Sequence, residues 1–232
     1  MTNNEIRAQL FAQQDLKYRD FLAKLIPTTD KETIIGVRSA QAKDLVKQIA
    51  KTDIEGFFNN PLTDYHEERT IYGVVLGHWK TDIDSFLVEF DKWLPYVNNW
   101  AVCDSGVMSM KILGKKTNQA KVWEYLNEKL KTTNEPYTIR AIIVALFSYF
   151  IDDKYINETI KILQNIKSEH YYVNMALAWA FSVIIIKHYE LGLNLIKSQT
   201  LGKWVQNKSI QKSVESLRLT AEQKQELKLF KL

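Results

Sequence analysis

The sequence is poor in the residues that make turns. Among its 232 residues there are only 8 glycines and 4 prolines. An all-β sandwich or barrel needs more turn residues than this between its strands. The scarcity argues against an all-β fold and favours a chain built from helices.

Cysteine and long apolar runs are also scarce. Cys103 is the only cysteine, which excludes an intramolecular disulfide and a zinc site built from several cysteines. Residues 1–10 lack the basic and then apolar run of a signal peptide. The longest apolar stretch, residues 175–186, is too short to span a bilayer. We therefore expect a soluble, cytoplasmic protein without a membrane partner.

The composition is that of a folded protein with a mild positive charge. Hydrophobic residues make up 46% of the chain and charged residues 25%, which argues against disorder and predicts one domain or one continuous array over residues 1–232. The net charge of +4 permits a polyanionic partner without requiring one. Lysines are frequent from Lys187 to the C-terminus, and the simplest interpretation of them is a solvated helical face.

Apolar residues recur at helical spacing along nearly the whole chain. Capping patterns and prolines then predict where the helices begin and end. We expect a first helix from the Thr2–Glu5 capping box to Pro27, a loop over 28–36, a helix capped by Ser39, a short turn from Asp53, a helix over 65–79, one from Asp82 to Pro95, a short helix capped by Asn98 or Asn99, helices over 121–130, 136–151, 157–166 and 171–188, and shorter basic helices to the C-terminus.

Helices of this length with short polar connections predict an all-α fold. HEAT-like antiparallel pairs of roughly 40 residues would fit the chain, although no strict sequence period is present. Such pairs bury their apolar faces by stacking into a curved α-solenoid with one concave surface. A compact, irregular helical bundle stays open as the alternative.

Residues 96–105 contain the most informative side chains. Trp100 and Asp104 are four residues apart on an expected helix, so they project from the same face. An aromatic face beside a carboxylate can hold a cationic group, with the ring contributing about 0.5–2 kcal/mol. The alternative is a core tryptophan beside an acid that serves only the fold.

This segment resembles the signature of the AlkD-type DNA alkylation-repair family. The matching run is Asn-Asn-Trp-Ala-Val-Cys-Asp-Ser at 98–105. Weaker matches follow in the expected order, namely Ile-Gly-Val-Arg at 35–38, His-Glu-Glu-Arg at 66–69, Thr-Ile-Arg-Ala at 138–141 and Ala-Leu-Ala-Trp-Ala at 176–180. The resemblance covers most of the chain.

The resemblance implies a HEAT-like solenoid that holds double-stranded DNA with alkylated bases in a basic concave groove. It implies a DNA glycosylase that hydrolyses the N-glycosidic bond of cationic purines, such as 3-methyladenine and 7-methylguanine. The family needs no tight pocket for a flipped base, in contrast to most enzymes that act on a base. It also implies no metal or organic cofactor, and we expect a monomer. The rival hypothesis is a non-catalytic α-solenoid that binds DNA structure or a protein partner.

The resemblance assigns four site residues. Asp104 matches the catalytic carboxylate, which stabilises the oxocarbenium-like sugar and positions the attacking water. Trp100 and Trp179 match two aromatic walls beside the lesion, and Arg140 matches a residue that holds the DNA backbone. From the residues alone, Trp179 could be core, and Arg140 could pair with an internal acid.

The chain departs from the family pattern near the N-terminus. The family has an aromatic residue, often tyrosine, near the end of its first helical pair, where this chain has Pro27 with Phe21 as the closest aromatic upstream.

Other groups of candidate residues are weaker. His66 and Glu68 have the His-x-Glu order of zinc deaminases without the paired cysteines, and Cys103 is expected to be a buried structural thiol.

Overall fold

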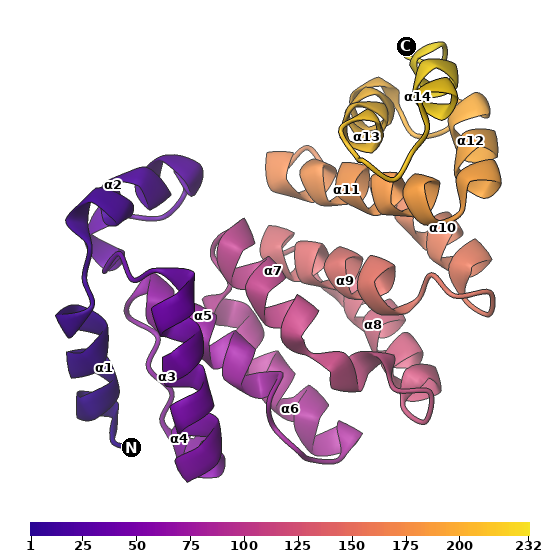
Figure 1. The fold of residues 1–232 in the computed structure, drawn as a ribbon. Helices are drawn as coiled ribbons and strands as arrows, with labels where there is room; N and C mark the ends of the chain where they lie inside the picture. Colours follow the sequence, from indigo (N-terminus) through magenta and orange to yellow (C-terminus); the bar gives the residue numbers. More distant parts are fainter. The chain divides into compact units, whose positions relative to one another are not determined.

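The computed structural model describes all 232 residues and is all-helical (Figure 1). It has fourteen α-helices, three short 3-10 helices and no β-strand, which confirms the all-α class. The α-helices are α1 (Asn3–Ala12), α2 (Leu16–Leu25), α3 (Ser39–Thr52), α4 (Ile54–Asn59), α5 (His66–Leu76), α6 (Ile83–Trp93), α7 (Trp100–Ser109), α8 (Gln119–Thr132), α9 (Pro136–Tyr149), α10 (Ile156–Asn165), α11 (Tyr171–Lys187), α12 (Tyr189–Lys197), α13 (Lys203–Val214) and α14 (Ala221–Lys228). The 3-10 helices are η1 (Lys31–Thr33), η2 (Leu94–Tyr96) and η3 (Lys111–Gly114).

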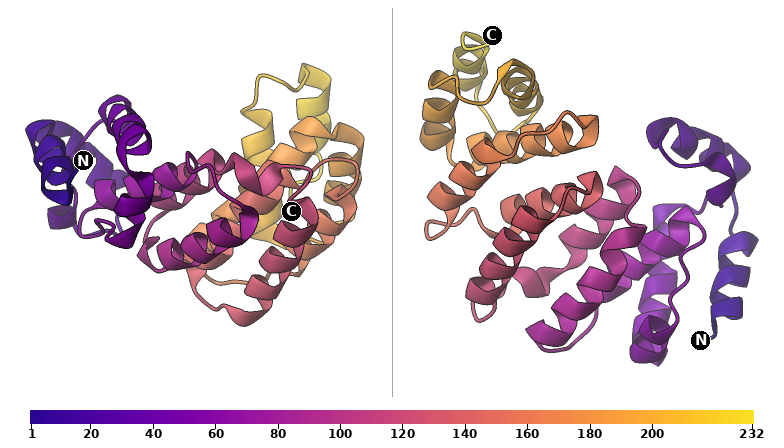
Figure 2. Two further views of the ribbon diagram at one scale, coloured as in Figure 1. Left: turned by 90° about the horizontal axis from the view of Figure 1, so that it is seen from below. Right: turned by 180° about the vertical axis from the view of Figure 1, so that it is seen from behind.

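The helices gather into two compact units. Unit 1 comprises Met1–Ala141 and unit 2 comprises Ile142–Leu232, with the boundary inside α9. Figure 2 shows the helices of both units from two further directions. The prediction that residues 1–232 act as one HEAT-like domain stays a prediction. None of the helices combines the length and the apolar content that crossing a membrane requires.

In unit 1, alternate helices form one layer. Helix α5 packs against α3 on one side and against α7 on the other, while α4 packs against α3 and α6 against α5. Helices α3 and α5 of the first layer are thus each supported by a helix of a second layer, α4 and α6 respectively. This alternation is compatible with the stacked helix pairs of an α-solenoid.

Two glycines let α5 and α7 approach closely. A Cβ atom at Gly73 or at Gly106 would lie 2.5 Å from the indole ring of Trp93, which is fully buried between them. The indole Nε1 of Trp93 donates to the carbonyl of Arg69 at 3.1 Å, so the ring is fixed as well as enclosed. Because a side chain at either glycine would overpack this core, the glycines set the position of α7 against α5.

The first 27 residues fold differently from the prediction. A single helix up to Pro27 is wrong, because the chain breaks between α1 and α2. The side chain of Asp15 accepts from the backbone N–H of Tyr18 at 2.9 Å, and its own N–H donates to Gly36 O at 3.0 Å. Asp15 therefore begins a second helix and ties it to the loop at Gly36, a choice that apolar periodicity does not report.

Most predicted caps are confirmed. Thr2 and Glu5 form the expected capping box, and Asp82 accepts from Ser85 N at 2.9 Å. Ser39 is an exception, since α3 has Arg38 at its N-cap without a side-chain cap and Ser39 is its first residue. The loop expected over 28–36 also contains the short helix η1.

The buried carboxylate of Glu67 holds the segment before α3. It accepts the backbone N–H groups of Ile35, Gly36 and Val37 at 2.9, 2.7 and 3.1 Å. Gly36 has a φ of +94°, and a Cβ there would lie 2.5 Å from Asp15 O. The Ile-Gly-Val-Arg and His-Glu-Glu-Arg motifs therefore meet in one structural contact.

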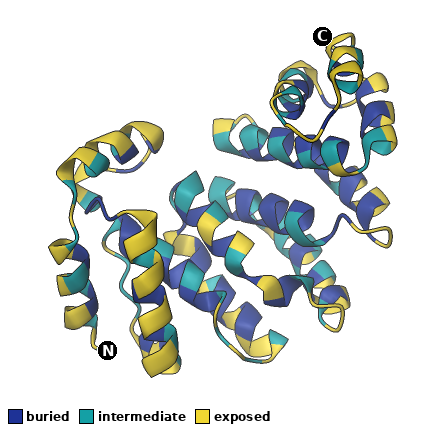
Figure 3. Cartoon of the chain, viewed as in Figure 1, coloured by how far each residue is buried: buried dark blue, intermediate teal, exposed yellow.

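In unit 2 the apolar helix α11 is the centre of the core. It packs against α12 and α13, and a Cβ at Gly192 would lie 2.5 Å from the Ile185 backbone, so α11 and α12 are in close contact. Figure 3 shows α11 with mostly buried and intermediate residues, beside C-terminal helices that have more exposed residues. None of the basic residues from Lys187 onward is buried, which agrees with a solvated face.

Candidate active site in the unit 1 groove

A groove of about 1040 Å³ opens in unit 1 beside α2, α3, α5 and α7. We call it the unit 1 groove. Its apolar lining includes Leu22, Val46 and Ile71, and its polar lining includes His66 and Thr70. Both Trp100 and Asp104 line it, as expected for two residues one helical turn apart. The segment singled out from sequence therefore faces a cavity large enough for a ligand.

Asn99 fixes the start of the helix that carries these two residues. Its side-chain Oδ1 accepts from the backbone N–H groups of Ala101 and Val102 at 2.9 and 3.0 Å. An asparagine at this position satisfies N–H groups that a helix cannot pair internally. Of the two caps that the sequence allowed, Asn99 is the one used.

Trp100 is held by its neighbours as well as by its helix. Its indole Nε1 donates to Leu25 O at 2.9 Å. The side chain packs against the buried cluster of Leu22, Ile26 and Ile34. The ring is thus half-buried in one orientation and adds an aromatic surface to the groove.

Asp104 forms a bidentate ion pair with Arg140 from α9. Arg140 Nε lies 2.9 Å from Asp104 Oδ1, and a terminal nitrogen lies 2.7 Å from Oδ2. The exposed fraction is 13% for the Asp104 side chain and 6% for that of Arg140. Burial lowers the pKa of the Arg140 guanidinium, but the hydrogen bonds and the charge of Asp104 outweigh burial and raise that pKa above its ordinary value. The pair is therefore charged and oriented.

This geometry bears on the role expected for Arg140. The guanidinium pairs with an internal acid, as the alternative from sequence allowed, and that acid is Asp104 itself. Both of these bonds are made by N–H donors of the guanidinium. The contact with DNA phosphate stays a prediction.

Cys103 is a buried thiol next to this pair. Its side chain is inaccessible, and burial raises its pKa well above the ordinary value, with the charge of Asp104 acting in the same direction. A thiol held protonated is a poor nucleophile. This agrees with the structural role that the sequence suggests.

Lysines supply the positive charge around the groove. Lys43, Lys47 and Lys111 line it and are exposed. The two acids in the lining are Glu67 and Asp104; Glu67 binds backbone N–H groups and Asp104 binds Arg140. Lys47 also pairs with the exposed Asp44 at 3.1 Å. The exposed charges that line the groove are therefore positive, which suits an anionic ligand.

Tyr18 contributes an aromatic ring to the N-terminal side of the unit 1 groove. It lies on α2, lines the groove, and packs with Trp100 against the same apolar cluster. Phe21, the nearest aromatic before Pro27, is 56% exposed and is not part of the lining. Sequence reasoning missed Tyr18 because the break between α1 and α2 changes which face of α2 points to the groove.

Trp179 lies in unit 2, on α11. Its ring is half-buried and lies 4.7 Å from the ring of Phe147, centroid to centroid. Its role as a second aromatic wall stays a prediction.

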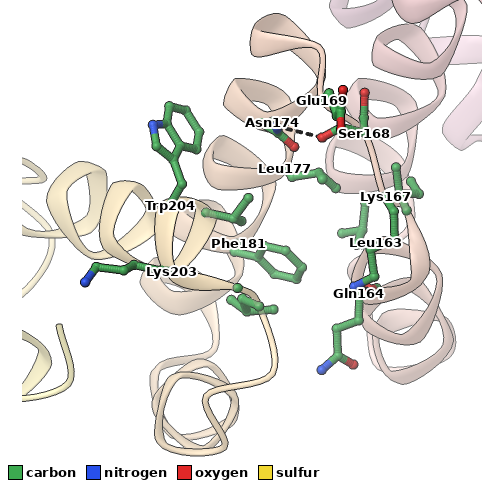
Figure 4. Close-up of a pocket in the computed structure, with 14 residues that line it drawn as sticks. Leu163, Gln164, Lys167, Ser168, Glu169, Asn174, Leu177, Phe181, Lys203 and Trp204 are labelled. Carbon is green, nitrogen blue, oxygen red and sulfur yellow. Dashed lines mark hydrogen bonds between the residues drawn. The ribbon is translucent and has the colours of Figure 1, made fainter. Parts of the chain in front are cut away.

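A second cavity, the unit 2 cavity, has a volume of about 510 Å³ (Figure 4). Its lining includes the apolar Leu163, Leu177 and Phe181, while Lys203 points away from them.

No group of three or more His, Cys, Asp or Glu side chains gathers anywhere in the chain to hold a metal ion.

The protein is thus all-helical, and its unit 1 groove contains an oriented carboxylate and aromatic rings and is lined by exposed lysines. A family model described as DNA alkylation repair enzyme matches residues 6–213, so the chain belongs to that family. Neither the comparison with curated proteins nor the comparison with solved structures gives a match. Membership implies an enzyme that binds DNA and takes part in alkylation repair.

Proposed function

We propose that this protein is a DNA glycosylase that hydrolyses the N-glycosidic bond of cationic alkylated purines, such as 3-methyladenine and 7-methylguanine. The observation that carries the proposal is the Asp104 carboxylate, which lines the unit 1 groove one helical turn from Trp100. The substrate is alkylated double-stranded DNA, and the proposed reaction consumes only water. The family match supports a role in DNA alkylation repair. The carboxylate and the aromatic ring in the groove support glycosylase activity as the reaction.

The chemistry suits a single carboxylate. An alkylated purine already carries its positive charge, so it can leave without being protonated by an acid. The bond from the base nitrogen to C1′ breaks and the bonding pair goes to the base, which leaves an oxocarbenium-like sugar. Asp104 stabilises that positive charge electrostatically and orients the water whose oxygen then bonds to C1′, while the water's proton passes to solvent. A fixed carboxylate in a partly dehydrated site acts more strongly than one in bulk water.

Arg140 takes part through its bond to Asp104. A DNA phosphate beside the guanidinium would compete with Asp104 for its N–H donors. The carboxylate then keeps its place on α7 but has more of its charge available for the sugar. Lys43 and Lys47 on α3 would neutralise neighbouring phosphates.

The two tryptophans are proposed to stabilise the lesion by their π faces. Trp100 is held beside Asp104 in the groove, so a cation near the carboxylate also meets the ring. Trp179 has the same proposed role from unit 2. An aromatic wall that binds the cation would favour alkylated over neutral purines.

The test is base release from a defined duplex. The unmodified protein is incubated with duplex DNA that carries one 7-methylguanine, and the free base and the abasic strand are quantified. We expect both products in equal amounts, with far slower release from a duplex carrying the neutral base hypoxanthine. Binding to the methylated duplex without any released base would contradict the glycosylase and leave the rival hypothesis of a non-catalytic DNA-binding solenoid.

A further inference from the structure

His66 is a buried side chain in the unit 1 groove that the proposed reaction does not use. It is the first residue of α5, is 5% exposed, and lines the groove together with Trp100 and Asp104. The lysines of the same groove are exposed, so His66 lies deeper than they do. Burying a histidine costs free energy unless its ring nitrogens form hydrogen bonds.

One ring nitrogen of His66 has a defined partner. Its Nδ1 lies 3.2 Å from the side-chain Nδ2 of Asn99, which also donates to Thr29 Oγ1 and to Asn98 Oδ1, each at 3.0 Å. The orientation of the Asn99 amide is fixed, because its Oδ1 accepts from Ala101 N and Val102 N at the start of α7. The atom that faces Nδ1 is therefore an amide nitrogen, which donates and has no lone pair to offer.

This contact favours one tautomer of the ring. Asn99 Nδ2 can only donate, so a proton on His66 Nδ1 would face this atom without an acceptor, and Nδ1 is therefore the nitrogen without a proton. A neutral ring then carries its proton on Nε2. Burial lowers the pKa of His66, although the charge of Glu67 acts in the opposite direction, so the neutral form is favoured.

The Nε2–H group has no acceptor within the protein. Every hydrogen bond of the His66 ring in the structure is made by Nδ1, and the buried atoms that lack a partner do not include Nε2. Nε2 is thus accessible from the groove that the ring lines. A donor without a partner costs about 1–3 kcal/mol when it is shut away from water, so an acceptor that enters this groove gains by meeting it.

We propose that His66 is a substrate-contacting residue, whose Nε2–H donates to an acceptor atom of DNA in the unit 1 groove, and that Asn99 fixes its tautomer for that contact. The inference rests on the proposal that this groove holds DNA. The acceptor is an oxygen of the sugar-phosphate backbone or a base-edge nitrogen or oxygen. Because Asn99 also begins the helix of Trp100 and Asp104, one side chain orients the donor and the proposed catalytic group together.

Two substitutions separate the two nitrogens. In His66→Asn, the amide oxygen takes about the place of Nδ1 and keeps the bond to Asn99, but nothing replaces Nε2. In His66→Gln, the amide nitrogen reaches about the place of Nε2 and can donate, but the bond to Asn99 is lost. The affinity for an undamaged duplex and the melting temperature are measured for both variants and for the unmodified protein.

We expect opposite rankings from the two measurements. His66→Asn should melt close to the unmodified protein and bind the duplex about five- to tenfold more weakly, the loss of one net hydrogen bond. His66→Gln should melt about 2–4 °C lower and bind within about twofold of the unmodified protein. A purely structural histidine would give the same ranking in both measurements, and that result would overturn the proposal.

The source of the acceptor and the dependence on the proposed reaction can both be resolved. A duplex with 3-deazaadenine in place of adenine lacks the minor-groove N3 acceptor of that base. A vanished effect of His66→Asn in this duplex assigns the contact to adenine N3, and an unchanged effect assigns it to another acceptor of the duplex. Affinity does not require base release, so the proposal is testable even if the protein releases no base. Unchanged affinity of His66→Asn, or no affinity of the unmodified protein for DNA, contradicts it.

Discussion

The unit 1 groove and the unit 2 cavity are both built from helices but differ in what they bury. The unit 1 groove contains an ion pair, Asp104 with Arg140, whose side chains are 13% and 6% exposed, together with the buried His66 and Glu67. The unit 2 cavity has charged residues only in exposed positions, including Glu169 and Lys203, above apolar side chains.

The burial of charged groups in the unit 1 groove has a cost in folding free energy, which the unit 2 cavity does not have. Removing a charge from water is expensive unless a partner is held in good geometry, and apolar residues of similar volume often serve stability as well. None of the charged side chains that line the unit 2 cavity is buried. The buried and oriented ionisable groups of unit 1 suggest a functional site, and four experiments test this contrast between the units.

The largest effect is expected from Arg140→Ala. It leaves the buried Asp104 carboxylate without its guanidinium, which costs about 3–5 kcal/mol of folding free energy in thermal or denaturant unfolding. DNA binding should weaken, and the slope of log affinity against log salt should fall by about one if the guanidinium also binds a phosphate. The exposed Arg218 of unit 2 gives the control Arg218→Ala, for which we expect a change within about 0.5 kcal/mol. Equal destabilisation by both changes would remove the contrast between the units.

The next effect is expected from Glu67→Gln. Glutamine has one acceptor oxygen and a donating nitrogen, so it cannot receive the three backbone N–H groups of residues 35–37. We expect a loss of about 3 kcal/mol in denaturant unfolding. Glu169→Gln, the matched change at the unit 2 cavity, should be nearly neutral, and a loss there as large as at Glu67 would contradict the account.

A smaller effect is expected from Lys43→Ala at the rim of the unit 1 groove. Stability should stay within about 0.5 kcal/mol, because the side chain is exposed. Duplex affinity should fall, and the salt slope should decrease by about one, as for the loss of one phosphate contact. Lys203→Ala at the unit 2 cavity is the comparison. If it lowers the slope as much, the unit 1 groove is not the preferred surface for DNA.

The smallest effect concerns pH. Burial lowers the pKa of His66, against the charge of Glu67 and together with that of Arg69. As the pH falls below about 6.5, the His66 imidazole binds a proton in the unfolded chain before it does so in the folded protein. The free energy of unfolding therefore decreases as the solution becomes more acidic. The melting temperature of the unmodified protein should therefore fall more steeply from pH 7 to pH 5 than that of His66→Asn. Parallel curves would show that His66 stays neutral in both states or titrates equally in both.

Much of the fold could be predicted from sequence because it depends on local signals. Apolar periodicity located most helices, and Thr2 and Asp82 marked starts that the structure confirms. Apolar periodicity did not show the break before α2. Its local sign is the Asp15 cap at Tyr18, and its second support is a contact between Asp15 and the distant Gly36, which local signals do not report.

The candidate site was predictable in part for the same reason. Trp100 and Asp104 belong to one helical turn, so their shared face follows from spacing. The contacts of Asp104 with Arg140, of His66 with Asn99 and of Tyr18 with the groove join separate elements. Spacing within one helix does not report such contacts, and the sequence placed His66 only in the weak His-Glu-Glu-Arg match and in a metal motif that the chain lacks.

The most direct test of the central claim is single-turnover release of 7-methylguanine by Asp104→Asn. The amide keeps the size of the side chain and one acceptor for Arg140 but removes the charge. With folding checked by melting and duplex affinity measured in parallel, we expect release to slow by about 100-fold or more at nearly unchanged affinity. Asp153→Asn, at an exposed acid of unit 2, should release base at the rate of the unmodified protein. A folded Asp104→Asn variant that releases the base at the full rate would contradict the assignment of the chemistry to the unit 1 groove.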